Sequence, residues 1–494
     1  MLELFLSFLE PSNILIAVLA SIYGIVIGVI PGLGPTLGLA LLIPIIIFMP
    51  MVSALTILGA TFGAAIYGGC ISAILINSPG TPGSVATSFD GYPLALQGRG
   101  AYAVGAATSA SGIGSILGIL FLIFLGPPIA YFSLRFGPAE NFVLAILGLA
   151  FIARTIEGSF LKGIMAAVLG LFLSTVGQDI VLGYSRFSFG ISYFEDGIKF
   201  IPAIIGLFAV SQALTLAEEG GTISKTGKVN TKEILTGAFE SIRYWKTTLR
   251  SSIIGIGLGI LPGLGISTAN ILAYTEEKRN SKDGDTFGKG NIRGVIAPES
   301  ANNAVMGGSL IPAFTLGIPG GSAAAVFLVA LNFLGFQPGF RLYTVNADIL
   351  YGLIIAMLIG TVIFVVVGLI SMNVLIRLTI LPNEYLVPGI LVMCVLGAYA
   401  SRYNMGDAWL CLAMGVLGYF FTKIKFPIVP LVIALVLGPI VEQSFIRAML
   451  TSNWSLMIFA RSPICVVVLL LTLLVLIEPV IKHFLKKKKA INAS

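Results

Sequence analysis

The chain has 494 residues, of which 57% are hydrophobic and only 10% are charged, and its mean hydropathy is +1.00. Soluble domains carry about 25% charged residues, and one crossing of a bilayer takes about 20 apolar residues. The long apolar runs therefore exclude a soluble protein and predict an all-α polytopic membrane protein. The net charge of +7 fits basic cytoplasmic loops, so we do not expect nucleic-acid binding.

Hydropathy predicts about twelve transmembrane segments. In the first half they lie near residues 13–49, 53–77, 101–127, 139–156, 160–178 and 199–217. In the second half they lie near residues 251–275, 300–317, 322–340, 347–380, 385–422 and 426–481, and each of the last two ranges is long enough for two helices. We therefore expect a first repeat over 1–217, a linker over 218–250, a second repeat over 251–481 and a tail over 482–494.

Charge predicts the orientation of the chain. The linker holds six basic residues and the tail holds five lysines, so both are expected in the cytoplasm. The N-terminal end offers Glu3 and Glu10 but no basic residue, which favours an outside N-terminus. An odd number of crossings then separates the N-terminus from the linker, and the two repeats would lie in opposite orientations in the inner, cytoplasmic membrane.

Two phrases rich in helix-breaking residues occur in each half. "GVIPGLG" (28–34) matches "GILPGLG" (259–265), and "YGGCISAILINSPGTPGS" (67–84) matches "MGGSLIPAFTLGIPGGS" (306–322). The second match pairs Gly68-Gly69 with Gly307-Gly308 and Pro79-Gly80 with Pro319-Gly320. Four such landmarks in the same order predict two inverted structural repeats, each with broken or re-entrant helices.

Broken helices in a membrane need a physical reason. Irregular backbone is tolerated there only where it is buried in protein or lines a wet cavity. A half-helix that starts at a break directs unpaired N–H groups and a positive dipole end at an anion, whereas unwound carbonyls suit a cation. Glycine and proline are also common in ordinary membrane helices, where small residues serve packing. Paired breaks in two repeats favour a secondary transporter over packing alone.

The chain resembles the large membrane subunit of tripartite tricarboxylate transporters, the TctA family. The resemblance rests on "IPGLGPTLGLALLIP" (30–44), "YGGCISAILINSPGTPGSVATSFDGYPLALQGRG" (67–100) and "FGKGNIRGVIAPESANNAVMGGSLIPAFTLGIPGGSAAAVFL" (287–328). It implies uptake of carboxylates such as citrate, driven by an ion gradient. It also implies two partners, an extracytoplasmic solute-binding protein and a small four-helix membrane subunit.

The repeated phrases contain the candidate site residues. Hydroxyls, amides and backbone N–H groups can bind a carboxylate without a full countercharge. We therefore expect Pro79-Gly80 and Pro319-Gly320, the two Pro-Gly tips, to face each other across the substrate. The candidate substrate-binding residues are Asn77, Pro79, Gly80, Thr81, Ser84, Asn302, Asn303, Pro319, Gly320, Gly321 and Ser322. The candidate cavity-framing residues are Pro31, Gly32, Gly34, Pro262, Gly263 and Gly265.

Two acids stand close to these phrases. Glu299 in "APESANNA" and Asp90 in "SFDGYP" are candidates for coupling to a co-transported Na⁺ or H⁺, because an ionisable residue in a membrane segment is expected to be functional. Either acid could instead cap a helix, or pair with Arg99 or Arg293. We expect alternating access of the elevator type, in which both tips move with the substrate.

Other functions remain open at this point. A binding-protein-independent transporter of another small organic anion, or an ion channel, would also need irregular backbone in the membrane. An enzyme is not expected, because the chain has no HExxH or GxSxG motif, and its four cysteines and one histidine form no cluster with metal-ligand spacing. Neither a metal nor a resident cofactor is therefore predicted.

Overall fold

The structure, a computed structural model, describes residues 2–30, 33–154, 160–179, 183–219, 233–262, 265–371 and 383–491. These residues are helical almost throughout. Their sheet is a two-residue antiparallel ribbon of β1 (Gly177–Gln178) and β2 (Ser185–Arg186). Seven helices are long and apolar enough to cross a bilayer, which confirms an all-α polytopic membrane protein. The total of about twelve segments stays a prediction.

The helices begin and end near the interruptions in the hydrophobic runs of the sequence. Before residue 220 they are α1 (Leu2–Phe8), α2 (Pro11–Val29), α3 (Gly34–Ile46), α4 (Met51–Ile76), α5 (Val85–Leu96), α6 (Gly100–Ser133), α7 (Pro138–Arg154), α8 (Phe160–Ser174), α9 (Ser192–Glu195), α10 (Phe200–Ile204) and α11 (Ser211–Glu219). A 3-10 turn, η1 (Pro82–Ser84), precedes α5, and a π-helical stretch, η2 (Ile205–Val210), joins α10 to α11.

After residue 232 the helices are α12 (Ile234–Arg243), α13 (Trp245–Ile260), α14 (Gly265–Asn280), α15 (Arg293–Leu316), α16 (Ser322–Phe333), α17 (Phe340–Thr344), α18 (Ala347–Ile370), α20 (Asn383–Ala400), α21 (Met405–Lys423), α22 (Ile428–Thr451), α23 (Ile458–Arg461) and α24 (Pro463–Ile491). A 3-10 turn, η4 (Gly284–Thr286), lies between α14 and α15. Part of the predicted linker is therefore helical, because α12 and the start of α13 lie inside it.

The chain divides into two compact units. The first comprises Met1–Ala130 and Ile201–Tyr419, and the second comprises Tyr131–Phe200 and Phe420–Ser494. Both predicted repeats contribute to each unit. The described residues of all four broken segments lie in the first unit, so the candidate site is built there.

Within the second unit, α22 packs against α7 and α8. Small residues allow the close approach: a Cβ atom added to Gly170 would lie 2.2 Å from the Leu431 carbonyl oxygen. Arg186 of β2 forms ion pairs with Glu442 of α22 and, at 3.2 Å, with Asp179. The ribbon is thereby fastened to α22.

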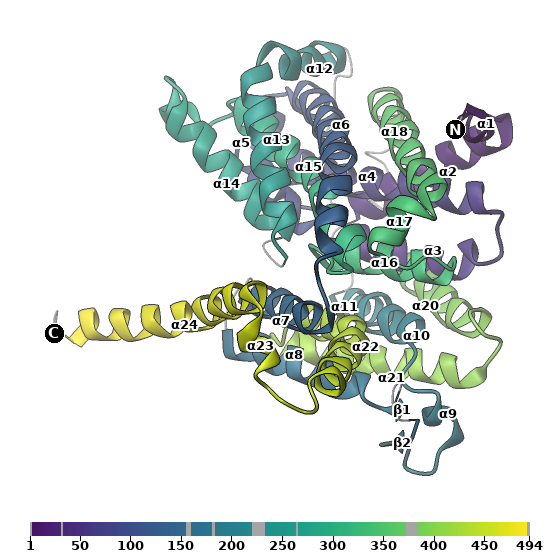
Figure 1. Ribbon diagram of the computed structural model, residues 1–494. Helices are drawn as coiled ribbons and strands as arrows, with labels where there is room; N and C mark the ends of the chain where they lie inside the picture. The colour runs from purple at the N-terminus through teal and green to yellow at the C-terminus, as the bar shows by residue number, and fades with distance from the viewer. Residues whose placement is uncertain are drawn as a thin grey trace. The chain divides into compact units, whose positions relative to one another are not determined.

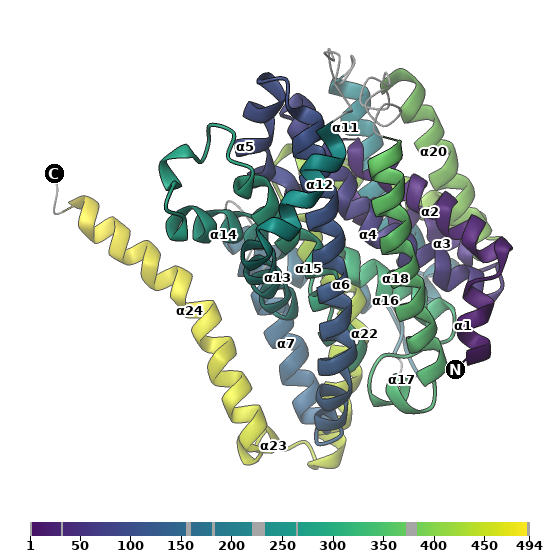
Figure 2. The same ribbon diagram turned by 90° about the horizontal axis from the view of Figure 1, so that it is seen from above.

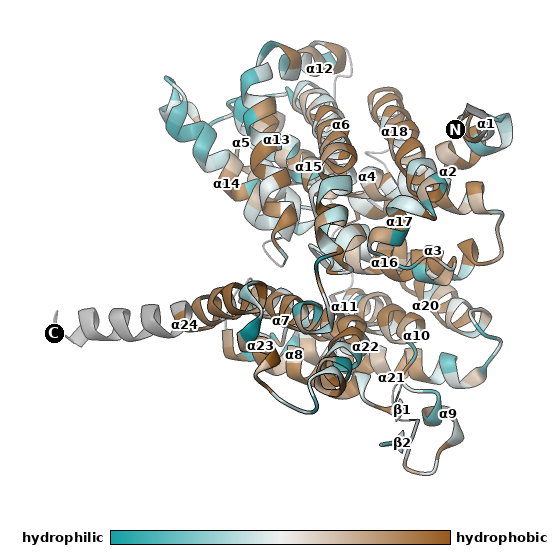
Figure 3. Ribbon diagram, viewed as in Figure 1, coloured by the Kyte–Doolittle hydropathy of each residue, from teal (hydrophilic) through white to brown (hydrophobic). Residues whose placement is uncertain are grey.

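Within the first unit, α2 packs along α4 and α13 packs along α15 (Figure 1). The view from above in Figure 2 also shows α13 beside α15. Hydrophobic residues run along α18, whereas the far end of α14 is hydrophilic (Figure 3). Each broken segment is thus accompanied by one packed helix pair, α2 with α4 in the first repeat and α13 with α15 in the second.

The two pairs share one type of close contact. A Cβ atom added to Gly68 would lie 2.5 Å from the Ile25 carbonyl oxygen, and one added to Gly308 would lie 2.6 Å from the Ile256 carbonyl oxygen. Only glycine permits backbones to approach this closely. The α2/α4 and α13/α15 crossings therefore have the same local geometry.

The tips are seated in the same way in both pairs. The Gly80 N–H donates to the Gly69 carbonyl at 3.2 Å, and the Gly320 N–H donates to the Ser309 carbonyl at 3.3 Å. A Cβ atom at Gly80 would lie 2.0 Å from the Gly28 carbonyl oxygen, and one at Gly320 would lie 2.4 Å from that of Gly259. Each tip thus lies directly against the end of the helix that precedes the PGLG phrase.

The packing changes the register of the repeat. It pairs Gly68 with Gly308, one residue beyond the sequence alignment, which paired Gly68-Gly69 with Gly307-Gly308. The helix ends set this register, because α4 and α15 both finish on a left-handed residue, Asn77 (φ 53°) and Gly317 (φ 72°). The inverted orientation of the two pairs in the membrane stays a prediction.

Alanine substitutions at adjacent glycines test this packing. Gly320→Ala is expected to destabilise the protein by roughly 1–3 kcal/mol, because the new methyl group overlaps the Gly259 backbone. Gly321→Ala is the matched control, since a Cβ there meets no atom within 4 Å. Thermal unfolding in detergent measures both. Equal melting midpoints for the two variants would contradict the close contact.

Candidate functional site

The start of α3 lies beside both Pro-Gly tips. The Thr36 and Ser322 hydroxyls are hydrogen-bonded at 2.9 Å, which joins the first turn of α3 to the first residue of α16. A Cβ atom added to Gly34 would find the Thr81 methyl group as its neighbour at 3.9 Å. The PGLG phrase of the first repeat is therefore placed between the tips.

The start of α14 completes the group. A Cβ atom added to Gly83 in η1 would lie 2.1 Å from a methyl carbon of Ile266, the second residue of α14. The N-terminal ends of α3, α14 and α16, together with the η1 turn that leads into α5, therefore lie next to one another. Each of these four helix starts directly follows one of the helix-breaking phrases that occur in both halves of the sequence.

Left-handed backbone explains why a glycine ends each PGLG phrase. Gly34 has φ +60° and Gly265 has φ +69°, a region that residues with a side chain rarely adopt. A helix begins at each of these residues. A Cβ atom at Gly265 or at Gly321 would meet no atom within 4 Å, so space remains beside the starts of α14 and α16.

This arrangement suits an anion. The first N–H groups of each helix have no partner within the helix, and the aligned peptide dipoles leave positive potential there. Hydroxyl groups add donors: Thr81 and Ser84 are buried, with 3.4 Å between their oxygens, and Ser322 is half-buried. Such groups bind a carboxylate through hydrogen bonds and dipoles, without a lysine or arginine.

A buried carboxylate lies behind η1. The Thr87 hydroxyl donates to Glu299 Oε1 at 2.5 Å, and the Ser111 hydroxyl donates to Oε2 at 3.0 Å. Glu299 is fully buried in α15 and takes part in none of the ion pairs found among the described residues. A buried carboxylate held only by neutral groups is a suitable partner for a proton or a small cation.

The neighbouring asparagines have different surroundings. Both polar atoms of the Asn302 side chain are buried without a hydrogen-bond partner among the described residues, and the Gly83 backbone lies against its amide oxygen. Asn303 instead donates to the Ser115 hydroxyl at 2.9 Å and to the Gly63 carbonyl at 3.2 Å. Asn302 therefore lies beside the tip and next to Glu299, whereas Asn303 joins α15 to α4 and α6 through its amide nitrogen and leaves its amide oxygen without a partner among the described residues.

Asp90 holds a loop in place. Its Oδ1 accepts the backbone N–H groups of Gly288, Gly290 and Asn291 at 2.7–2.9 Å, and its Oδ2 accepts the Tyr274 hydroxyl at 2.9 Å. Four donors account for the burial of this carboxylate without any ion. These contacts favour a structural role for Asp90.

The basic residues considered as partners of these acids are engaged elsewhere. Arg99 lies 3.9 Å from a carboxylate oxygen of Glu233 and stacks on the Tyr102 ring at 4.1 Å. Arg293 forms ion pairs with Glu277 and Asp283. Neutral donors therefore dominate the electrostatics of the candidate site.

Several residues of the site escaped the sequence analysis. Asn270 of α14 accepts the Ala86 N–H at 2.7 Å and so caps the start of α5, and Thr87 and Ser111 bind Glu299. Thr36, in the repeated region of the first half, is a further site residue that sequence reasoning missed. The spacing of Ser84 and Thr87 on one helical face is the signal that could have indicated Thr87.

The remaining candidates shape the backbone. Asn77 is exposed as the left-handed cap of α4, Pro79 and Pro319 lead into the seated tips, and Pro262 follows Leu261, the C-cap of α13. Pro31, Gly32 and Gly263 lie outside the described residues, so their predicted part in framing the cavity is not tested.

Comparison with known proteins identifies relatives. The model of the "Tripartite tricarboxylate transporter TctA family" matches residues 14–433. An Agrobacterium vitis protein described as an uncharacterized 52.8 kDa protein in the TAR-I ttuC' 3' region is 33% identical over 460 residues, covering 92% of this chain and 91% of the relative. A second A. vitis protein, described as an uncharacterized protein in the TAR-II ttuC' 3' region, is 35% identical over 207 residues, covering 42% of this chain and 86% of the relative. No solved structure matches this chain.

The loop contacts of Asp90 can be tested by Asp90→Asn. The amide cannot accept all four hydrogen bonds as a carboxylate does, so we expect a loss of at least about 2 kcal/mol in stability and faster amide hydrogen exchange at 288–291. Tyr274→Phe removes one donor and should cost less. Unchanged exchange at 288–291 in Asp90→Asn would contradict the anchoring role.

Proposed function

The chain belongs to the tripartite tricarboxylate transporter TctA family, and from this membership we propose that it is the permease through which carboxylates such as citrate cross the membrane, driven by an ion gradient. The family makes it a component of a tripartite transporter and a multi-pass membrane protein. The identity of the substrate, the coupling ion and the transport mechanism form the proposal.

One observation carries the proposal: four helix starts that follow repeated breaks meet at one place in the first unit. Thr36 joins Ser322, and Gly83 lies against Ile266. Converging helix N-termini with nearby hydroxyls form a binding site for an anion whose charge is spread over carboxylate oxygens. We propose that the substrate carboxylates bind at this place, with Ser84 and Ser322 among their donors.

The coupling ion is assigned to Glu299 rather than to Asp90. Glu299 is buried beside η1 and is held by neutral groups: the Thr87 and Ser111 hydroxyls donate to it, and Asn302 and Ser84 also interact with it. Asp90 already accepts four donors from a loop. A proton or Na⁺ at Glu299 would offset its buried charge and favour the approach of the anionic substrate to Asn302 and the tip.

Alternating access of the elevator type remains part of the proposal. The tips are seated on α2 and α13, and the central helices are clamped by further glycines: Gly360 of α18 against Ala60 of α4, and Gly114 of α6 against Ser300 of α15. These contacts leave little room for the tips to slide alone. We propose that both tips and the helices that hold them move as one body with the substrate.

The assembly around the permease follows from the family. We propose that an extracytoplasmic solute-binding protein delivers the carboxylate and that a small four-helix membrane subunit completes the transporter. The chain would lie in the inner membrane, with the 218–250 linker and the C-terminus in the cytoplasm.

Uptake into proteoliposomes tests the proposal and the two serines together. The full chain, alone and with both partner subunits, is supplied with labelled di- and tricarboxylates, with and without a Na⁺ or proton gradient. We expect concentrative uptake that depends on the gradient, and a KM raised roughly tenfold or more in Ser84→Ala/Ser322→Ala, because hydrogen bonds to a charged ligand are lost.

Ser88→Ala is the matched control for these serines. Ser88 lies in α5, the helix that directly follows Ser84, and its hydroxyl donates to the Val85 carbonyl at 2.8 Å. The KM of the Ser88→Ala variant should therefore stay unchanged. Equal KM values for the double variant and the control would contradict the assigned donors. Flux that only follows the substrate gradient would indicate a channel.

Glu299→Gln tests the coupling role. The amide keeps the shape of the side chain but cannot carry the negative charge, so uptake should lose its dependence on the ion gradient while substrate exchange across the membrane continues. Asp90→Asn serves as the comparison, since that variant should retain the gradient dependence. Gradient-driven uptake by Glu299→Gln with unaltered ion stoichiometry would refute the assignment.

A further inference from the structure

A basic pocket with a volume of about 400 Å³ lies where α12 ends and α13 begins, against the last turns of α14. Its lining residues are Arg243, Tyr244, Trp245, Lys246, Thr247, Arg250, Glu277, Asn280 and Arg293. Four of these side chains are cationic and one is acidic. The pocket is separate from the substrate site proposed above and is not explained by it.

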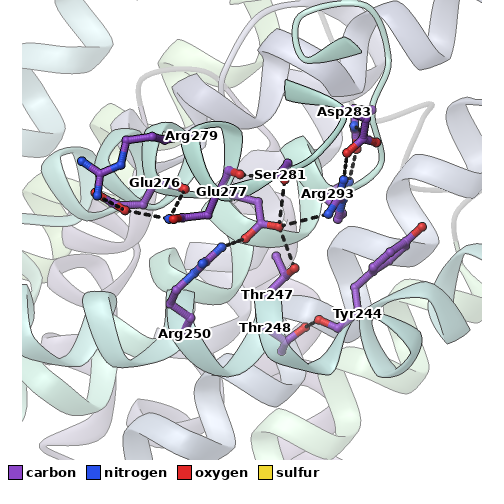
Figure 4. A network of polar contacts seen from close by, with 12 residues as sticks. Tyr244, Thr247, Thr248, Arg250, Glu276, Glu277, Arg279, Ser281, Asp283 and Arg293 are labelled. Carbon is purple, nitrogen blue, oxygen red and sulfur yellow. Dashed lines mark hydrogen bonds and ion pairs between the residues drawn. The ribbon is translucent and has the colours of Figure 1, made fainter. Parts of the chain in front are cut away.

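The single carboxylate of the pocket is already shared. Glu277 is buried and binds Arg250, receives the Thr247 hydroxyl at 2.8 Å and lies 3.7 Å from Arg293 (Figure 4). Figure 4 also shows Arg293 reaching Asp283, with which it forms an ion pair. Glu277 thus holds two guanidinium groups in fixed positions at the wall of the pocket.

The other two cations are less neutralised. Arg243 lies 3.5 Å from Glu240, but 71% of its side chain is exposed, so this contact is weak. Lys246 lies over the Trp245 ring at 5.7 Å, and among the described residues no carboxylate forms an ion pair with it. The pocket therefore presents excess positive charge to an external anion.

An exposed apolar stripe beside the pocket indicates its level relative to the lipid bilayer. Helix α12 lies crosswise at the start of α13 (Figure 1). One face of α12 packs on α6, since Gly237 contacts the Tyr102 carbonyl and Ser241 bonds to Ser109. The outer face bears apolar side chains three and four residues apart that are about three-fifths exposed: Leu235, Phe239 and Ile242.

The stripe continues onto α13 beside the cations. Trp245, Leu249 and Ile253 are all exposed, at the same spacing. An apolar face flanked by basic residues and a tryptophan is the pattern of a helix at the boundary between headgroups and acyl chains. The stripe would contact acyl chains, and the basic pocket would stand at the level of the phosphates.

We propose that this pocket binds the phosphate group of an anionic phospholipid from the surrounding leaflet. Arg243 and Lys246 supply charge that the protein leaves uncompensated, and Arg250 is oriented by Glu277. The exposed stripe favours a lipid over a free phosphate ion, because it gives the acyl chains a surface beside the headgroup. A bound lipid would hold α12 against α6 and α13.

Fluorescence of Trp245 measures this binding directly. The chain has three tryptophans, so Trp409→Phe/Trp454→Phe leaves Trp245 as the reporter in the full-length protein. Brominated phosphatidylglycerol in phosphatidylcholine vesicles should quench it more strongly than brominated phosphatidylcholine. Arg243→Gln/Lys246→Gln should lower the relative association constant for phosphatidylglycerol by roughly tenfold.

The control removes the same charge elsewhere. Arg341→Gln/Arg461→Gln changes two exposed arginines outside the pocket and should keep the preference for phosphatidylglycerol. If Arg243→Gln/Lys246→Gln does not fold, Lys246→Gln alone should still show a reduced preference. Equal quenching by the two lipids, or an equal loss in the control, would overturn the proposal.

A further experiment with inorganic phosphate distinguishes a lipid headgroup from a free phosphate ion as the ligand. Inorganic phosphate added to pure phosphatidylcholine vesicles should leave Trp245 emission unchanged and should not abolish the phosphatidylglycerol preference. If phosphate alone reproduced or removed the effect, the site would bind a free anion and the lipid assignment would be wrong. All these readings are made without transport, so they stand apart from the test of carboxylate uptake.

Discussion

The fold of the first unit depends on one constraint: a polypeptide that breaks its helices inside a bilayer must still pair its backbone groups. Gly80 and Gly320 meet this constraint by donating to carbonyls of the helices that precede them. Their missing side chains also allow contact with the backbones of Gly28 and Gly259. The breaks are therefore held against the helices that precede the PGLG phrases, and the helix starts that follow them gather at one place.

Matching geometry does not bring matching chemistry. In the register set by the packing, Glu299 of α15 corresponds to Gly59 of α4, and Asn303 corresponds to Gly63. The first central helix thus uses small residues to receive α18, whereas the second carries a buried acid and two amides. If Glu299 holds the coupling ion, as we propose, a substrate between the two tips would meet an ion-responsive group on one side only.

Buried acids of the same unit serve different purposes because their donors differ. Asp90 accepts backbone N–H groups from a loop, so its charge is offset by the peptide chain itself. Glu277 is offset by guanidinium groups and builds the wall of a basic pocket. Glu299 is held by neutral groups, among them the Thr87 and Ser111 hydroxyls, and for this reason we propose it as the partner of the coupling ion. The set of donors, rather than burial, distinguishes these three roles.

The sequence by itself determined the helical membrane class, the positions of the breaks and the family, because hydropathy and Gly-Pro phrases are local properties of the chain. The tips and the helix breaks in both halves could therefore be predicted from the sequence, and Glu299 could be selected as a candidate acid. Only the tertiary structure decided which distant residues meet. Thr36 joins Ser322 across 286 positions, and Thr87 joins Glu299 across 212 positions. No local pattern encodes such contacts. The register of the repeat was likewise decided by packing, since glycine contacts and left-handed helix ends are set in three dimensions.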